Sequence, residues 1–468
     1  MHPSTTNMRS VERGAWSVER SRWPATLHAL RSTLALLGAI ACGTAEGART
    51  PEASVTFGEA RVVSASTEVG AAPTFAVGPD GRRAVAWVSA PGGGTDGRLY
   101  VAPVGADGAL GATAELRDAL GPIEPHGEAP PKLAFAPSGA LYALWVVGKD
   151  VPGRRFPMSA LRFARSDDGG RTWTAPASVT DLPQPFGSFN FHALQAGRGD
   201  TVYATWLDGR AGKSATFMTR STDGGRTWAP NVRVDPAGEA CPCCRTAVVA
   251  GRGDTVYAAW RKVFPGNVRQ VVVARSADGG RTWAAPVAAQ RDGWVIDGCP
   301  HAGPSLQVDA AGRVHVAWWT GKEGAAGVFY ARSDDGGRTF GAPAPLGVAT
   351  YSRPAHVQLA LDAAPNAAPN AEPTVVATWD DGTVRQPRVL VRVSRDGGAT
   401  FGPASEASAP GRSATFPVLA AHAGRVTLAW NEEAGSVEEH HHAARDTEAH
   451  QPLPSVGRKT IVMRDGRL

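Results

Sequence analysis

The chain has 468 residues and a net charge of +5, with 55 glycines and 36 prolines against only 19% charged residues. So many turn-forming residues predict many short strands rather than helices. The positive charges are mostly arginines scattered through predicted turns, and no basic cluster is interleaved with aromatic residues, so nucleic acid is excluded as an expected partner.

The first 50 residues differ from the rest of the chain. Arginines precede an apolar run at residues 34–41, which is followed by Cys42 and a short polar stretch. Such a run is too short to span a bilayer and is typical of an export signal. Residues 39–42 also resemble a bacterial lipobox, in which Cys42 becomes the lipidated first residue. We therefore expect residues 1–50 to be a signal peptide and leader, and the mature protein to be exported, either lipid-anchored to the membrane or secreted.

From residue 51 onward, an apolar strand that ends in tryptophan recurs at steps of 51 to 61 residues. The seven tryptophans are Trp87, Trp145, Trp206, Trp260, Trp318, Trp379 and Trp430. A second predicted strand precedes several of them, and further strands follow. An inner strand, a tryptophan strand, a third strand and an outer strand make one blade of a β-propeller. We expect residues 51–468 to form a single all-β propeller domain of four-stranded blades, with seven blades favoured and six as the alternative.

A second motif, S-x-D-x-G-x-T-[WF], follows the third strand of five of these units. Its copies begin at Ser166, Ser221, Ser276, Ser333 and Ser394. The motif predicts a hairpin turn in which the aspartate accepts hydrogen bonds from turn N–H groups and the glycines supply positive φ. The hydroxyls close the turn locally, and the aromatic residue anchors it on the sheet.

This motif resembles the Asp-box, or BNR repeat, of the sialidase superfamily, whose members are β-propellers. The resemblance covers roughly residues 55 to 468 and supports the fold. It implies little about activity, because Asp-boxes lie on the outer part of the blades. The six blades of catalytic sialidases are the reason for keeping six as the alternative.

The last unit ends at residues 462–468 without an outer strand. We expect residues 53–57 or 60–64 to supply that strand and thereby close the ring, which removes exposed sheet edges. Two insertions interrupt the later units, at residues 363–373 and 432–454. The second contains three histidines, residues 440–442; metal binding is one interpretation, and a solvated loop is the favoured one.

Cysteines and histidines are concentrated where inner strands begin, which is where propeller ligands usually bind. Cys241, Cys299 and His126 each stand 19 residues before a repeat tryptophan, so equivalent positions should converge on the ring axis. His192 and His356 enter nearby. The predicted metal site comprises Cys241, Cys243, Cys244, Cys299, His301 and His126, a soft ligand set suited to copper or zinc.

Disulfides are the favoured interpretation of the same cysteines, ahead of a metal or redox site, and free buried thiols are the third. Four remain after Cys42, which is an even number in a chain expected to be exported. Cys241 or Cys243 bonded to Cys299 would join neighbouring blades, and a Cys243–Cys244 pair is also conceivable. Three cysteines and a proline within four residues argue against simple cross-linking, because one cysteine per blade would be enough. The pair of motifs, CPCC and CPH, resembles those of some bacterial sialidase-like exported proteins, which supplies no mechanism.

The sialidase resemblance implies three arginines that grip a carboxylate, a tyrosine nucleophile with a glutamate base, and an aspartate acid. The arginine expected in the first blade is absent, because that strand contains Ala72-Pro-Thr-Phe. The remaining candidates near strand entrances are Arg245, Arg353, Arg412 and Tyr351, with Glu128 as the base; Arg261, Asp292 and Asp297 lie nearby. The alternative is that these arginines bridge blades or face solvent.

The sequence therefore favours an exported, lipid-anchored propeller that acts as a binding or accessory module, with a glycan or an exported protein as partner. Its expected site is the Cys/His group at the mouth of the ring. The alternatives are an exo-α-sialidase-type glycoside hydrolase and a disulfide-stapled surface scaffold.

Overall fold

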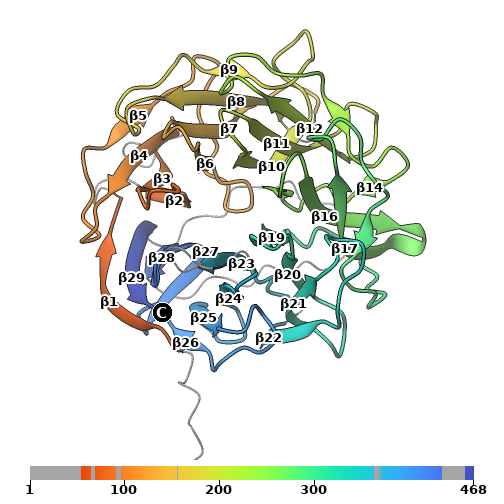
Figure 1. Ribbon diagram of the computed structural model, residues 1–468. Helices are drawn as coiled ribbons and strands as arrows, with labels where there is room; N and C mark the ends of the chain where they lie inside the picture. Colours follow the sequence, from red (N-terminus) through yellow and green to blue (C-terminus); the bar gives the residue numbers. More distant parts are fainter. Residues whose placement is uncertain are drawn as a thin grey trace, which may run out of the picture. The chain divides into compact units, whose positions relative to one another are not determined.

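The computed structural model contains seven antiparallel sheets, which follow one another around a ring within the unit Pro51–Leu468 (Figure 1). The structure describes residues 54–64, 69–90, 96–154, 157–350, 352–362, 368, 370–434 and 459–468. Cys42, Tyr351 and residues 440–442 lie outside these ranges. Seven sheets confirm the favoured blade count. No helix in the described part of the chain is long and apolar enough to cross a membrane.

The strands of each blade are antiparallel and run from the ring axis outward. The first strands are β2 (Val69–Val77), β6 (Lys132–Phe135), β10 (Phe189–Ala196), β14 (Glu239–Ala240) with β15 (Ala247–Ala250), β19 (Ser305–Val308), β23 (Gln358–Asp362) and β27 (Arg412–His422). The second strands are β3 (Arg83–Ala90), β7 (Leu141–Lys149), β11 (Val202–Asp208), β16 (Val256–Phe264), β20 (Val314–Thr320), β24 (Thr374–Asp381) and β28 (Arg425–Ala434).

The third strands are β4 (Arg98–Val104), β8 (Met158–Ser166), β12 (Ala215–Ser221), β17 (Val268–Ser276), β21 (Gly327–Ser333), β25 (Arg388–Ser394) and β29 (Thr460–Arg467). The fourth strands are β5 (Ala114–Leu116), β9 (Ala177–Ser178), β13 (Val232–Arg233), β18 (Val287–Ala288), β22 (Ala344–Val348), β26 (Ser405–Glu406) and β1 (Thr56–Val62). A short 3-10 turn, η2 (Pro265–Asn267), joins β16 to β17.

The repeat tryptophans hold the blades together. All seven lie on second strands and are buried, with at most 4% of their surface exposed. Buried apolar residues form seven clusters, each made by two neighbouring sheets. The tryptophans therefore pack in the spaces between blades, where large apolar side chains stabilise the ring by excluding water.

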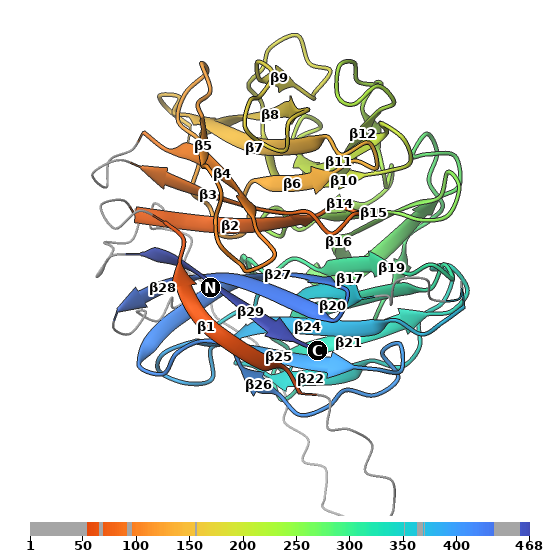
Figure 2. The same cartoon turned by 60° about the vertical axis from the view of Figure 1, so that its left-hand side comes forward.

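The ring is closed by pairing between the first and the last strand of the propeller, as expected. Strand β1 pairs with β29 and completes the seventh sheet, as Figure 2 shows. Ser64 Oγ accepts a hydrogen bond of 3.0 Å from the Ile461 backbone N–H just beyond this pairing. The predicted closure by the N-terminal part of the propeller is confirmed.

The Asp-box turns have the predicted hydrogen bonds. In the copy that follows β12, Asp223 accepts from the hydroxyl groups of Ser221 and Thr227, at 2.7 and 2.6 Å, and from the Thr227 backbone N–H. Gly224 and Gly225 have positive φ, as the turn requires. The turns lie between third and fourth strands, away from the axis. They therefore stabilise the blades, and any site at the axis is built from other residues.

Candidate metal centre

The first strand of the fourth blade is interrupted by the cysteine motif. Ala240 of β14 stands opposite Lys262, and Ala247 of β15 stands opposite Ala259. Six residues, 241–246, therefore face only two on the partner strand, and the excess must leave the plane of the sheet. The Cys241 backbone N–H still donates to the Arg261 carbonyl at 2.8 Å, so the bulge begins directly after this residue. A bulge re-aims side chains, and here it turns three thiols toward one place.

The three thiols of this bulge are buried against one another. The Sγ atoms of Cys243 and Cys244 each lie 3.7 Å from that of Cys241. Their exposed fractions are 4%, 1% and 1% for Cys243, Cys244 and Cys241. They pack in the cluster between the third and fourth blades, together with Ala129 from the loop before β6. All four cysteines of the described region are free thiols.

Cys299 and His301 reach the same place from the loop before β19. The Sγ atoms of Cys243 and Cys299 and a ring nitrogen of His301 all lie within 4.8 Å of one another. The Sγ atoms of Cys241, Cys243 and Cys244 form a second group within the same limit. His301 has φ of +45°, which is unusual for a residue with a side chain and marks a conformation held by its surroundings. Five of the six predicted metal ligands are thus brought together.

Two buried arginines place positive charge beside the thiols. Arg269 Nη1 donates to Cys241 Sγ at 3.0 Å, and its guanidinium is held by Asn267 Oδ1. Arg261 is 1% exposed, donates to the carbonyls of Ala302 and Trp319, and lies 5.2 Å from the ring centre of Trp294. Positive charge in a water-poor site stabilises thiolates, which are the form that binds metal.

The acidities of the thiols diverge because their partners differ. Hydrogen bonds from Cys243 and Cys244, reinforced by Arg269 and Arg261, hold the pKa of Cys241 well below its ordinary value. A hydrogen bond from Cys243 and another from His301 lower the pKa of Cys299 to about 5. Burial raises the pKa of Cys244 to about 11 and also raises that of Cys243. Two thiolates and two thiols in contact suit a soft metal ion or thiol–disulfide chemistry.

A buried ionic network adjoins the cysteines and joins four blades at the axis. Glu128, which is 1% exposed, accepts from Arg245 Nη1 at 2.9 Å and lies 3.2 Å from His356 Nε2. The other imidazole nitrogen, Nδ1, lies 2.6 Å from Asp380 Oδ2. The Gly303 backbone N–H, two residues from His301, points at Glu128 Oε2 at 3.4 Å.

Electrostatic attraction decides the charge state of this network. Burial by itself favours neutral His356, but Asp380 and then Glu128 outweigh burial and raise the imidazole pKa. The same ion pair with His356 lowers the pKa of Asp380 against the opposing effect of burial. The network therefore fixes the loop before β6 against the fourth and sixth blades.

The residues suggested by the sialidase resemblance have partners within the protein. Arg245 is 5% exposed and divides its guanidinium between Glu128 and the Val357 carbonyl. Arg353 donates to backbone carbonyls, the nearest being that of Val384 at 2.8 Å. Arg412 pairs with Glu432 within its own sheet. Arg245 thus bridges blades, whereas Arg353 and Arg412 have partners within their own blades. The catalytic assignment remains a prediction, and its nucleophile, Tyr351, lies outside the described residues.

The other histidines and acids of the sequence prediction belong to neither ligand group. His126 Nδ1 accepts from the backbone N–H groups of Glu128 and Ala129, and its ring packs edge-on against Phe191; it belongs to neither ligand group. His192 is fully buried, and burial lowers its pKa to about 3. Asp292 accepts from Thr320 and Gln290 side chains, and Asp297 is exposed.

Sequence reasoning missed Arg269 and Asp380. Arg269 lies on the third strand of the fourth blade, and Asp380 follows the sixth repeat tryptophan. Neither stands at a first-strand entrance, where most of the predicted site residues lie. An Asp directly after a repeat tryptophan occurs once among the seven copies and was the available signal for Asp380.

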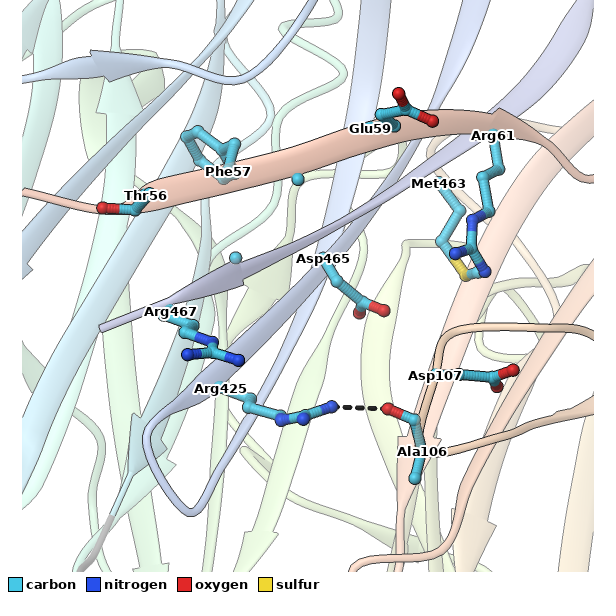
Figure 3. Close-up of a pocket in the computed structure, with 12 residues that line it drawn as sticks. Thr56, Phe57, Glu59, Arg61, Ala106, Asp107, Arg425, Met463, Asp465 and Arg467 are labelled. Carbon is cyan, nitrogen blue, oxygen red and sulfur yellow. Dashed lines mark hydrogen bonds between the residues drawn. The ribbon is translucent and has the colours of Figure 1, made fainter.

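An open pocket of about 470 Å³ lies away from these residues, at the ring seam (Figure 3). It is lined by parts of β1 and β29, the start of β28 and the turn after β4, where Arg425 donates to the Ala106 carbonyl. Its charged residues are three arginines and three acids, so no net charge selects a ligand. None of the predicted site residues lines it.

Comparisons with known proteins agree on the fold. Residues 124–293 match the BNR repeat-like domain family. No curated protein matches the sequence. A solved protein of unknown function from Dyadobacter fermentans is 14% identical, with a TM-score of 0.51 over 88% of this chain and 99% of that one. A PL25 polysaccharide lyase, an ulvan lyase, is 16% identical, with a TM-score of 0.50 over 79% and 93% of the two chains. A Hadza microbial sialidase is 18% identical over 74% and 73%, with a TM-score of 0.42. Residues 124–293 of the chain are thus similar to the BNR repeat-like domain, and the whole described region folds as a seven-bladed β-propeller.

Proposed function

We propose that this protein is an exported binding module whose propeller holds a soft metal ion, copper or zinc, at the axial end of its fourth and fifth blades. One observation carries the proposal: four free thiols and one imidazole, from two separate loops, form two ligand groups that share Cys243. Thiolate and imidazole are the ligands that Cu(I) and Zn(II) prefer.

The surroundings of the thiols support a metal site over simple packing. A buried cysteine that only fills space needs no positive partner, whereas Cys241 receives a guanidinium N–H at 3.0 Å. His301 keeps a strained backbone conformation while its ring stays beside two sulfurs. Strained residues are most often retained where the position of a side chain matters for function.

The arginines favour a binding module over a sialidase-type hydrolase. Gripping a substrate carboxylate needs guanidinium groups that are free to form bidentate pairs. Arg245 is buried and already paired with Glu128, and Arg353 and Arg412 have carbonyl and carboxylate partners. A glycan or an exported protein remains the proposed partner, and Cys42 the proposed lipid anchor.

Metal analysis combined with thiol counting tests the metal site. The full-length protein is purified from its native compartment, its copper and zinc contents are measured, and thiols are counted after denaturation without reductant. We expect bound copper or zinc and four reactive thiols from the propeller. The double variant Cys243→Ser/Cys244→Ser should lose the metal, because neither group of three ligands remains. Lys213→Ala, which changes a side chain that is 77% exposed, is the matched control and should keep the metal. Absence of free thiols would establish the disulfide scaffold instead.

The lipid anchor needs its own experiment. Wild-type protein is expected to sediment with membranes, and Cys42→Ser is expected to be soluble after the same fractionation. If the Cys42→Ser variant stays with the membranes, the anchor assignment is wrong and the metal site is unaffected.

A further inference from the structure

The five ligands of the proposed metal site form two groups of three rather than one group of five. Cys241, Cys243 and Cys244 make the first group, and Cys243, Cys299 and His301 make the second. Each group keeps its ligand atoms within 4.8 Å of one another. Two ligands of one ion lie at most about 4.6 Å apart when metal–sulfur bonds are about 2.3 Å. The five atoms do not form a single group within this limit, so one ion does not account for all five, and the two groups correspond to two ions that share Cys243.

We infer that the site binds two Cu(I) ions bridged by the Cys243 thiolate, an inference that rests on the proposed function. Each ion takes one of the two groups, and binding releases the protons of the thiols that are not already ionised. No electron is transferred, because copper enters as Cu(I) and remains Cu(I).

Ligand number favours Cu(I) over Zn(II). Structural zinc is almost always held by four protein ligands in a tetrahedron. Each group here offers three, and the all-cysteine group is buried, with its members between 1% and 4% exposed. Soft thiolates bind both metals, and of the two Cu(I) is the one that three ligands satisfy.

Charge balance points to the same ion. Four thiolates carry four negative charges, and Arg269 and Arg261 are the positive groups that act on Cys241. Two Cu(I) ions supply the two further positive charges that make the buried site neutral. Two Zn(II) ions would leave two uncompensated positive charges, which is costly in a buried site. Arg245 does not enter this balance, because Glu128 already neutralises it.

The two ions should differ in their exchange with solvent. The three residues of the first group are buried, whereas Cys299 and His301 of the second are partly exposed. The ion at Cys299 and His301 is therefore the one that a chelator or a thiol-bearing partner reaches first.

The stoichiometry of Cu(I) binding tests the inference. Reduced full-length protein is titrated anaerobically with Cu(I) against a chromophoric Cu(I) chelator, and X-ray absorption of the loaded protein measures copper–copper scattering. We expect two ions per chain and a short copper–copper distance. His301→Ala and Cys299→Ser should each halve the stoichiometry, removing the ion that exchanges faster in the wild type. Cys243→Ser should abolish copper–copper scattering.

The possible outcomes separate this inference from the function on which it rests. One ion per chain in the wild type overturns the two-ion site and leaves the proposed function standing. Two ions retained by His301→Ala overturn the assignment of His301 as a ligand of the second ion. Absence of Cu(I) and Zn(II) binding overturns both. His315→Gln, which alters a buried histidine outside both groups, is the matched control and should retain two ions. The copper–copper measurement on wild-type protein decides the matter without any variant.

Discussion

Replacement of Glu128 by glutamine is the sharpest test of the axial network. The change keeps the shape of the side chain and removes its charge. Arg245 and His356, which lie 2.9 and 3.2 Å from Glu128 Oε1, would then lose their shared counter-charge. Removing one partner of a buried ion pair costs about 3–5 kcal/mol, because the remaining charge is left uncompensated away from water.

This cost converts into a measurable shift of the melting temperature. An unfolding entropy of about 2.1 cal/mol/K per residue over roughly 400 residues gives about 0.84 kcal/mol/K, so the expected decrease is roughly 4–6 °C. Differential scanning fluorimetry of wild type and Glu128→Gln at pH 7 and a fixed scan rate measures it. Glu239→Gln is the matched control, since its partner, Lys213, is 77% exposed and such surface pairs contribute about 0–1 kcal/mol.

Two further variants, Arg245→Met and Glu128→Gln/Arg245→Met, test whether the unpaired charge of Arg245 causes the loss of stability. In Glu128→Gln/Arg245→Met the unpaired guanidinium is gone, so part of the lost stability should return. Equal melting temperatures for Glu128→Gln and Glu239→Gln would refute the argument that this network stabilises the axis. If the decrease in melting temperature of the double variant equals the sum of the decreases of Glu128→Gln and Arg245→Met, the two residues act independently.

Three other predictions concern pH and ring closure. Folding raises the pKa of His356, so the stabilisation from its charged form is full below about pH 6.5 and is lost as the pH rises through the folded-state pKa. The difference in melting temperature between wild type and His356→Gln should therefore be larger near pH 6 than near pH 9. An equal difference at both pH values would contradict this prediction. Hydrogen bonds from the Thr227 side chain and backbone lower the pKa of Asp223 to about 2, so this group stabilises above about pH 4 and ceases to do so as pH falls through that value; Asp223→Asn should lower the melting temperature at pH 7, by less than Glu128→Gln, and the difference should shrink toward pH 2. Deleting residues 51–64 removes β1 from β29 and exposes a sheet edge; size-exclusion chromatography should show aggregation or an expanded monomer, whereas deletion of residues 51–53 should leave a compact monomer.

The blade architecture was predictable because it repeats. Seven tryptophans and five Asp-boxes at nearly constant spacing report the same physical unit many times, so an error in one copy is corrected by the others. The closing strand was predictable for a related reason: the last unit lacked an outer strand, and an unpaired sheet edge has to be covered.

The site was predictable only in part, because it occurs where the repeat breaks. Counting 19 residues back from each tryptophan placed His126 level with Cys241, but His126 lies in a loop before β6, packs its ring against Phe191 and belongs to neither ligand group. Outside a strand, residue counting does not determine where a side chain points. The contact between Cys243, Cys299 and His301 depends on a six-residue bulge whose shape no spacing predicts.

The pairing of β1 with β29 also sets the order of events when the protein is made. The two strands are separated by roughly 400 residues, which a ribosome adds in roughly 20–80 s at about 5–20 residues per second. Throughout that interval β1 has no partner, and the seventh sheet cannot form. Completion of the ring therefore has to wait until β29 has been made, later than the formation of any other sheet.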